Sequence, residues 1–193
     1  YINLDSRVDR KDSIERQLNW LGIRDASRFA AIEDDPGILG CGKSHLAVLS
    51  LAEKLDLPYF LVCEDDVEFL APPSVFAGLI NEFVSNPSLD VLCLANRLRA
   101  PSLPVSKSLA VANSIQTTAC YMVKRSAVST LVRSHGESVE LLLGGGDPRS
   151  AALDIHWKRY QSSTLLFAIP RKTVARQMPS YSDVAKKFKH YKL

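Results

Sequence analysis

The chain has 193 residues, of which 46% are hydrophobic and 23% are charged, a balance typical of a globular domain and not of a disordered or fibrous protein. Its net charge of +3 is too small to indicate nucleic-acid binding, and no apolar run approaches the ~20 residues that span a bilayer. We therefore expect a soluble, cytoplasmic protein with a single domain over residues 1–193 and no nucleic-acid partner.

Short apolar runs alternate with amphipathic stretches, which predicts an α/β layer fold. The expected strands cover residues 1–4, 59–63, 91–94, 119–123 and 165–169. The expected helices cover residues 14–21, 43–55, 75–83 and 126–133, and a fifth starts at Asp147-Pro148, a capping residue followed by proline. Residues 96–118 and 144–146 are expected to form loops.

Helix ends are predicted from capping residues. Asp12 or Ser13 is expected to cap the first helix, and Ser74 to cap the third. Gly136 is expected to end the fourth.

The four cysteines are widely spaced and include no CxxC pair. Cys63, Cys93 and Cys120 lie in apolar, strand-like runs, where a buried free thiol is the usual state, and Cys41 lies outside them. This spacing argues against zinc and favours a reducing compartment.

Basic residues concentrate in residues 186–192. They predict either a peripheral contact with an anionic surface, such as the inner face of a membrane, or a solvated helix end or frayed tail.

Three carboxylates, Glu64, Asp65 and Asp66, directly follow the apolar run at residues 59–63. Five apolar residues predict a strand buried on both faces, and ligands of open α/β sheets bind outside the carboxyl ends of strands. Adjacent anions in such a place need a cation or strong hydrogen-bond donors. Carboxylate oxygens suit Mn²⁺ or Mg²⁺ bridging to phosphates, and the alternative is an acidic turn that ends the strand.

Polar residues also follow the first predicted strand. Asn3 and Asp5 are suited to a base or ribose, and Arg7 and Arg10 to phosphate. The alternative is a capped loop whose arginines pair with neighbouring surface carboxylates.

Residues 37–44 complete the GxxxxGKS pattern of a phosphate-binding loop, with Lys43 and Ser44 at its end. The preceding segment, Glu33-Asp34-Asp35-Pro36, is a poor strand end, although the motif needs a strand there. Because the pattern itself is complete, a phosphate-loop NTPase or kinase is nevertheless kept as an alternative. His45 is either a ligand-binding or a packing residue.

Several segments, taken in chain order, resemble one known family. They are YINLDSRVDR, RFAAIE, GCGKSHLAVL, FLVCEDDVEF, TTACYMVKRSAVSTL, LDIHW, ARQ and SYSD. Their order and spacing resemble those of glycosyltransferase family 25, which includes bacterial lipopolysaccharide galactosyltransferases and collagen β-galactosyltransferases. The resemblance covers nearly the whole chain, although Gly42-Lys43 is an unusual filling of its motif and residues 96–118 match none of its blocks.

The resemblance implies a GT-A-like, Rossmann-type nucleotide-sugar-binding sandwich with a mostly parallel central sheet flanked by helices. It also implies a UDP-sugar donor, a divalent metal (usually manganese) and inversion at the anomeric carbon. A hexose, galactose or glucose, would pass to a hydroxyl acceptor such as a glycan or glycolipid, for example in lipopolysaccharide biosynthesis. The resemblance also displaces the phosphate-loop interpretation of residues 37–44. A non-catalytic nucleotide-sugar-binding domain is the other alternative function.

The resemblance also implies roles for the acidic triplet. Asp66 would bind the metal directly, and Glu64 directly or through water. Asp65 would hydrogen-bond the ribose or donor sugar. The predicted nucleotide-site residues are Asn3, Asp5, Arg7, Arg10, Ser44, His45 and Gln177.

Asp154 is the predicted general base for the acceptor hydroxyl, with Asp147 in reserve. Trp157, three residues later, is expected to stack on a sugar. The alternative for Asp154 is a surface ion pair with Lys158 at i+4.

Overall fold

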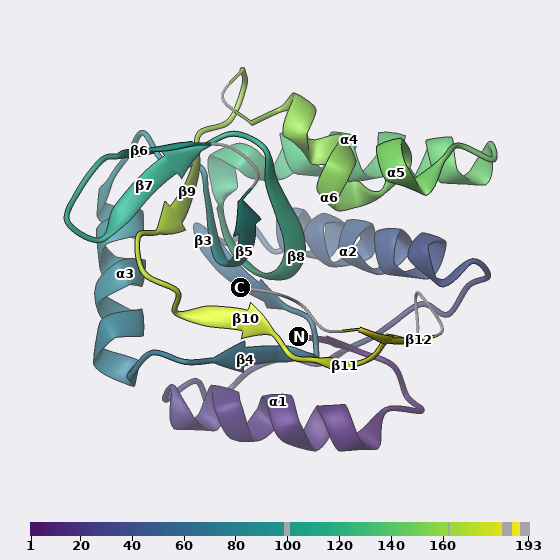
Figure 1. The fold of residues 1–193 in the computed structure, drawn as a ribbon, viewed down its shortest axis with the longest axis horizontal. Coiled ribbons are helices and arrows are strands. Elements are labelled where there is room, and N and C mark those ends of the chain that lie inside the picture. The colour runs from purple at the N-terminus through teal and green to yellow at the C-terminus, as the bar shows by residue number, and fades with distance from the viewer. Residues whose placement is uncertain (99–100, 162, 183–186, 190–193) are drawn as a thin grey trace.

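The computed structural model describes residues 1–98, 101–161, 163–182 and 187–189, and it shows a mixed β-sheet flanked by helices (Figure 1). The helices are α1 (Val8–Trp20), α2 (Gly37–Lys54), α3 (Pro73–Ser85), α4 (Arg125–Leu143), α5 (Pro148–Ala151), α6 (Leu153–His156) and the 3₁₀ helix η1 (Trp157–Arg159). The strands are β1 (Ile2–Asn3), β2 (Phe29–Ala30), β3 (Tyr59–Cys63), β4 (Val67–Phe69), β5 (Val91–Leu98), β6 (Ser102–Pro104), β7 (Leu109–Ala112), β8 (Ile115–Lys124), β9 (Phe167–Pro170), β10 (Ala175–Gln177), β11 (Ser180–Ser182) and β12 (Lys187–Lys189).

The main sheet has the order β3-β8-β5-β9-β7-β6, with β10 joined to β5 and β4 joined to β10. The α/β class is as expected, but the prediction of a mostly parallel sheet is wrong. Within the described part of this sheet, β5 is parallel to β9 and β10, and the other pairs are antiparallel. One cause is the connection from β5 to β8, whose described residues form β6 and β7 and no helix, so that β8 returns antiparallel to β5.

Helices cover both faces of the sheet, and neighbouring residues of β5 show this alternation. Leu92 and Leu94 pack in one core with side chains of α1 and α3. Val91 and Cys93 pack in the other with side chains of α2 and α4. In Figure 1, α1 accordingly lies on the opposite side of the sheet from the stacked α2, α4, α5 and α6.

Several predicted helix boundaries are wrong, and at the end of α4 the reason is that packing outweighs local propensity. α4 runs through Gly136 to Leu143, since Ser138 and Val139 beyond the glycine are buried beside α5 and α2. α2 begins at Gly37, six residues before the predicted start.

Capping was predicted correctly at one helix. Asp147 accepts a hydrogen bond from the backbone N–H of Arg149 and caps α5. α1 begins after Arg7, so Asp12 and Ser13 lie inside it, and α3 begins at Pro73, so Ser74 does not cap it.

Residues 96–118 were expected to be a loop, and that prediction is wrong. They contain the end of β5, β6, β7 and the start of β8. The strands are short, and β7 is secured by Leu109 and Ala110, which are buried and pair with β9. Residues 144–146 form the expected turn.

β3 has the predicted bounds, but it is buried on both faces only at its carboxyl end. Val62 and Cys63 are buried, whereas Tyr59 is 44% exposed. The exposed residue lies at the start of this edge strand, which among the described strands pairs along its length only with β8, whereas Glu64, directly after the strand, bridges to Ile2 of β1.

Of the basic residues 186–192, Lys186 and residues 190–192 lie outside the described residues. Lys187–Lys189 forms β12, antiparallel to β11, so this part is neither a helix end nor frayed. None of the helices in the described ranges combines the length and apolar composition that a membrane span requires.

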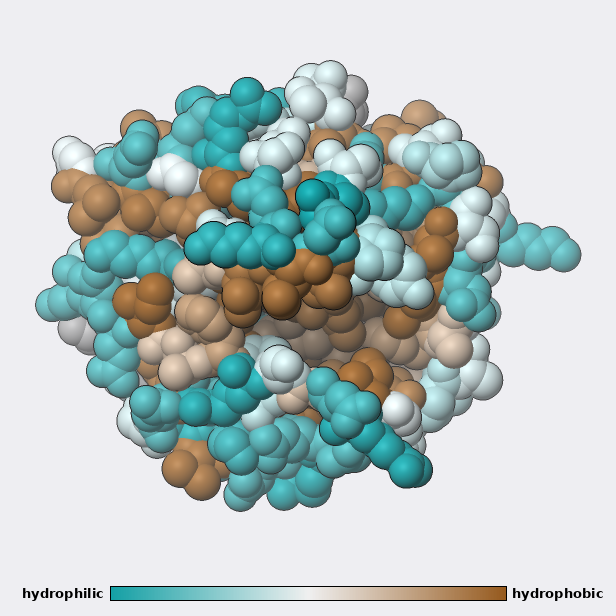
Figure 2. Space-filling view, turned by 180° about the vertical axis from the view of Figure 1, so that it is seen from behind, coloured by the Kyte–Doolittle hydropathy of each residue, from teal (hydrophilic) through white to brown (hydrophobic). Residues whose placement is uncertain are grey.

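Apolar side chains gather in a hollowed band on the face opposite to the view of Figure 1, with hydrophilic residues above and below it (Figure 2). A mainly apolar pocket of about 380 Å³ lies between the ends of α1 and α2 and strand β3.

Candidate functional site

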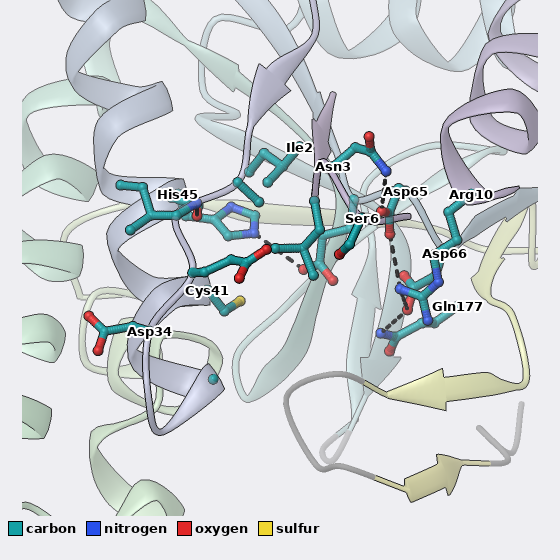
Figure 3. Close-up of a pocket in the computed structure, with 17 residues that line it drawn as sticks. Ile2, Asn3, Ser6, Arg10, Asp34, Cys41, His45, Asp65, Asp66 and Gln177 are labelled. Carbon is teal, nitrogen blue, oxygen red and sulfur yellow. Dashed lines mark hydrogen bonds and ion pairs between the residues drawn. The ribbon is translucent and has the colours of Figure 1, made fainter. Parts of the chain in front are cut away.

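Five segments far apart in sequence meet around a pocket of about 320 Å³: the amino terminus from β1 to Arg10, residues 31–34 after β2, the first half of α2, the end of β3 with the acidic triplet, and the end of β10. The bridge between Ile2 and Glu64 sets β1 beside the end of β3. Gln177 pairs in register with Val67, next to the acidic triplet, and so enters the same pocket. Figure 3 shows Cys41 and His45 of α2 on one side and Arg10, Asp66 and Gln177 on the other.

Most of the predicted site residues line this pocket. They are Asn3, Arg10, Ser44, His45, Glu64, Asp65, Asp66 and Gln177. Asp5, Arg7 and Asp154 do not line it.

Asp65 is held inside the protein. Its Oδ2 accepts a hydrogen bond from Asn3 at 2.7 Å and its Oδ1 accepts one from Arg10 at 3.0 Å. Burial raises the pKa of Asp65, and these two donors oppose that rise. Asn3 itself is buried, and its side-chain oxygen accepts from Arg28. Asn3 and Asp65 thus position the amino terminus against β3, and protein contacts occupy the groups that were expected to meet the nucleotide.

The negative charge of the Asp66 carboxylate is less well compensated by neighbouring groups than that of Asp65. Its Oδ2 accepts a hydrogen bond from Gln177 at 3.0 Å and lies 3.8 Å from Arg10, but its buried Oδ1 has no hydrogen-bond partner among the described residues. Burial, and then the neighbouring charge of Glu64, raise the pKa of Asp66 to about 7. The protein alone therefore does not fully stabilise the ionised carboxylate, and a cation would supply what is missing.

Glu64 faces the other side of the pocket. Its Oε1 accepts a hydrogen bond from Thr118 at 2.7 Å and lies 3.3 Å from Nε2 of His45. Burial would raise the pKa of Glu64, but the contacts with His45 and Thr118 outweigh burial and lower it. Glu64 is thus ionised next to Asp66.

The charge of the pocket is strongly unbalanced. Among the described residues, its lining contains one guanidinium, that of Arg10, and five carboxylates: Glu33, Asp34, Glu64, Asp65 and Asp66. Such a pocket repels an anionic ligand unless a cation accompanies it. The donor set is rich in hard oxygen and so fits Mn²⁺ or Mg²⁺.

The glycine-rich segment is not a phosphate-binding loop. Residues 37–54 form one continuous helix, and Lys43 forms an ion pair with Asp34. A Cβ added at Gly40 would lie 2.4 Å from the carbonyl oxygen of Ile32, so the glycine permits close approach of the chain. Ser44 links the same two segments, accepting from the N–H of Ile32 and donating to the carbonyl of Gly40.

Cys41 is a pocket residue that sequence reasoning missed. It lies four residues before His45, so α2 places both side chains on one face. The Sγ of Cys41, a ring nitrogen of His45 and a carboxylate oxygen of Glu64 lie within 4.8 Å of one another. The i, i+4 spacing of Cys41 and His45 was the sequence signal for this pair. The absence of a CxxC pair had argued against a metal site that includes cysteine.

Two predicted nucleotide-site residues lie outside the pocket lining. The side chain of Asp5 is 79% exposed and pairs with Arg28. Arg7 pairs through two hydrogen bonds with Asp9. For Arg7 this is the surface pairing that the sequence left open as an alternative.

Asp154 does not line the pocket but is connected to it by hydrogen bonds. Its Oδ2 accepts from the backbone N–H of Thr117 at 3.1 Å, and the Thr117 hydroxyl donates to Gln177 at 3.3 Å. Gln177 in turn donates to Asp66. Burial raises the pKa of Asp154, and its partner in this structure is Thr117, not Lys158.

Thr117 has a φ of 77°, a left-handed conformation that is unusual for a β-branched residue. Such strain is typical of functional sites, and here it aims both the N–H and the hydroxyl of Thr117 at site residues.

Trp157 is not a sugar-stacking platform. Its side chain is fully buried, and its indole N–H donates to the carbonyl of Ile115 at 2.9 Å. It packs edge-on against Tyr121 and Phe167 in the core that α2 and α4 cover. The short helix that carries Asp154 is thereby anchored to the sheet.

No protein-family model matches this chain, and no curated protein matches it significantly in sequence.

Proposed function

We propose that this protein is a metal-dependent glycosyltransferase of the GT-A type, which transfers a hexose with inversion from a UDP-sugar to a hydroxyl of a glycan or glycolipid. The proposal rests on the resemblance of the sequence to glycosyltransferase family 25 and on the chemistry of the pocket.

The observation that carries the proposal is the charge of the pocket. Five carboxylates, one of them paired with Lys43, line the pocket against one guanidinium and disfavour a bare diphosphate, and Asp66 Oδ1 has no hydrogen-bond partner among the described residues. A divalent cation resolves both problems, because it gives Asp66 a counter-charge and gives a diphosphate a place to bind. A nucleotide-sugar with its cation is therefore the ligand class that this pocket suits best.

Each residue then has a role in the reaction. Asp66 and Glu64 would hold the cation, which when bound neutralises charge on the departing diphosphate. Arg10, at the junction of Asp65 and Asp66, would contact a phosphate oxygen. The carboxylate of Asp154 would take the proton of the acceptor hydroxyl, and its burial raises its pKa toward the range useful for a base.

The test is release of UDP from a panel of UDP-sugars, with and without Mn²⁺, in the presence of saccharide acceptors. We expect turnover only with the cation, and we expect Asp66→Asn to remove most of it while the protein stays folded. Folding is preserved because the substitution removes a poorly compensated buried charge and keeps an acceptor for Gln177.

The matched control is Asp12→Asn, which neutralises an exposed carboxylate in α1. It should transfer sugar at the wild-type rate. Full turnover in excess chelator would overturn metal dependence. Binding of UDP-sugar without turnover on any acceptor would instead favour a non-catalytic nucleotide-sugar-binding domain.

A further inference from the structure

The α2 side of the pocket carries a donor set of a different kind from the acidic side. Cys41 and His45 stand one helical turn apart on α2, and Glu64 faces them from the end of β3. One sulfur, one nitrogen and one oxygen atom of these side chains lie within 4.8 Å of one another. Thiolate, imidazole and carboxylate together suit zinc better than manganese, which prefers oxygen alone.

The spacing of the atoms fits a tetrahedral ion. Two ligand atoms at about 2.0–2.1 Å from a tetrahedral zinc ion are about 3.3 Å apart. Nε2 of His45 and Oε1 of Glu64 are 3.3 Å apart. The sulfur, at about 2.3 Å from such an ion, would stand about 3.6 Å from the other two ligand atoms, a spacing inside the 4.8 Å within which the three atoms lie.

Neighbouring side chains orient two of the three ligands. Nδ1 of His45 lies 3.0 Å from the hydroxyl oxygen of Tyr121, which directs Nε2 toward Glu64 and Cys41. The hydroxyl of Thr118 donates to Glu64 at 2.7 Å. Partners of this kind, one layer behind the ligands, are typical of protein metal sites.

We propose that Cys41, His45 and Glu64 form a zinc site with three protein ligands and a fourth position open to the pocket. Three protein ligands and one open position are the arrangement of zinc ions that bind an exchangeable water or an external ligand. The absence of a CxxC pair argued against zinc in the sequence, but one thiolate is enough when the fold supplies an imidazole and a carboxylate.

The zinc site shares Glu64 with the manganese site of the proposed function. The effect of zinc on sugar transfer, which follows from this sharing, rests on that function. Glu64 bound to zinc is turned toward α2 and away from Asp66. Zinc is therefore expected to inhibit the manganese-dependent transfer reaction, and Cys41 to determine how strongly.

The decisive experiment uses Co²⁺ as a spectroscopic probe of the full chain under reducing conditions, with no sugar nucleotide present. We expect one equivalent to bind, with the near-ultraviolet charge-transfer absorption of a thiolate ligand and the intense visible bands of a tetrahedral ion. One equivalent of Zn²⁺ should abolish both. Cys41→Ser should remove the charge-transfer band, whereas Tyr121→Phe should keep it and weaken binding by about 10–100-fold.

Cys93→Ala is the control for thiols, because Cys93 is fully buried in the sheet and does not line the pocket. It should give the wild-type cobalt spectrum. Circular dichroism would show that Cys41→Ser is folded. A cobalt spectrum without a thiolate band, or one that Cys41→Ser leaves unchanged, overturns the proposal.

The spectra separate this proposal from the proposed function, because they need neither donor nor acceptor. Absence of transferase activity would leave the cobalt result standing. If the enzyme is active, zinc should inhibit the wild type and lose potency against Cys41→Ser. Equal inhibition of both, without a thiolate band, would place inhibitory zinc on Asp66 and refute the Cys41 site.

Discussion

At the residue scale, Asp154 is connected to the acidic triplet through Thr117 and Gln177 although it does not line the pocket. We expect Asp154→Asn to leave UDP-sugar affinity nearly unchanged and to lower turnover about 10²–10⁴-fold, the usual cost of losing a general base. Turnover by UDP release and affinity by calorimetry should be measured on the same preparation.

The alternative roles of Asp154 give different results. Wild-type turnover in Asp154→Asn would refute the base and move attention to Asp147, which in this structure caps α5. Reduced donor affinity with normal turnover at saturation would mean that Asp154 only positions Gln177 through Thr117.

His135 predicts a pH dependence of stability that is independent of catalysis. It is fully buried in α4, and burial lowers its pKa from 6.5 to about 3. The unfolded chain then binds a proton that the folded chain does not, so stability from this residue is complete above pH 6.5 and is lost as the pH falls toward 3. The free energy of unfolding should fall by up to about 1.4 kcal/mol per pH unit in that window.

Denaturant unfolding at several pH values checks this, with His135→Phe as the comparison. The phenylalanine variant should have a flatter profile between pH 6.5 and 4, where the remaining slope comes from carboxylates and from His156, whose pKa burial also lowers. Parallel profiles for the two proteins would show that His135 does not take up a proton on unfolding.

Part of the site could be predicted from single residues. The triplet at residues 64–66 follows a strong strand pattern, and that alone placed it at a strand end, where it is found. The sequence could not predict which carboxylate has its charge compensated by hydrogen bonds. Asp65 bonds to Asn3, 62 residues away in sequence, and Asp66 bonds to Gln177, 111 residues away. The sequence pattern contains no record of such contacts.

At the element scale, α2 packs closely against residues 32–34 because Gly40 has no side chain. A Cβ there would lie 2.4 Å from the Ile32 carbonyl oxygen and 3.0 Å from the Asp34 nitrogen, and backbone atoms cannot easily move away. We expect Gly40→Ala to cost about 1–3 kcal/mol of stability and to weaken ligand binding, because Ile32 and Asp34 line the pocket.

Gly78→Ala is the matched control in α3. Its Cβ would meet nothing within 4 Å, so alanine should stabilise the helix by about 0.5–1 kcal/mol. Both variants can be compared by thermal and denaturant unfolding. Equal stability of the two would mean that α2 shifts freely, and that Gly40 does not fix its distance from the pocket edge.

Elements with strong periodicity were predicted well, and those formed by pairing were not. β3 was predicted with its bounds because five apolar residues stand between Pro58 and the carboxylates of residues 64–66. β6 and β7 were missed because their edges are polar and their stability comes from pairing with β9 and with each other. The continuation of α4 past Gly136 likewise depends on tertiary packing against α2.

At the scale of the whole molecule, the pocket is lined by segments that are far apart in sequence. β1 contributes Asn3, and β10 contributes Gln177 through antiparallel pairing with β4. The α/β class followed from alternating patterns, but the mixed direction of the strands depends on how the β5–β8 connection folds back, which no local pattern records. A ligand in this pocket touches segments from across the chain and should therefore stabilise the entire fold.

This placement predicts a cooperative thermal shift. At about 100 times its dissociation constant, a ligand that binds only the folded state adds about 2.7 kcal/mol, or roughly 5–10 °C for a domain of this size. We expect this shift when UDP and Mn²⁺ are added together, and little shift from UDP in chelator, because five carboxylates then repel the diphosphate. Differential scanning fluorimetry measures both conditions directly.

Two variants show which residues produce the synergy. Asp66→Asn should reduce the joint shift to the small sum of the separate ones, because the cation loses its ligand beside Gln177. Asp12→Asn, on the exposed face of α1, should retain the full joint shift. A UDP shift of equal size in chelator would mean that Arg10 and the backbone hold the diphosphate unaided. The acidic triplet would then be a structural turn compensated by Asn3, Arg10 and Gln177, and the metal-dependent function would fall with it.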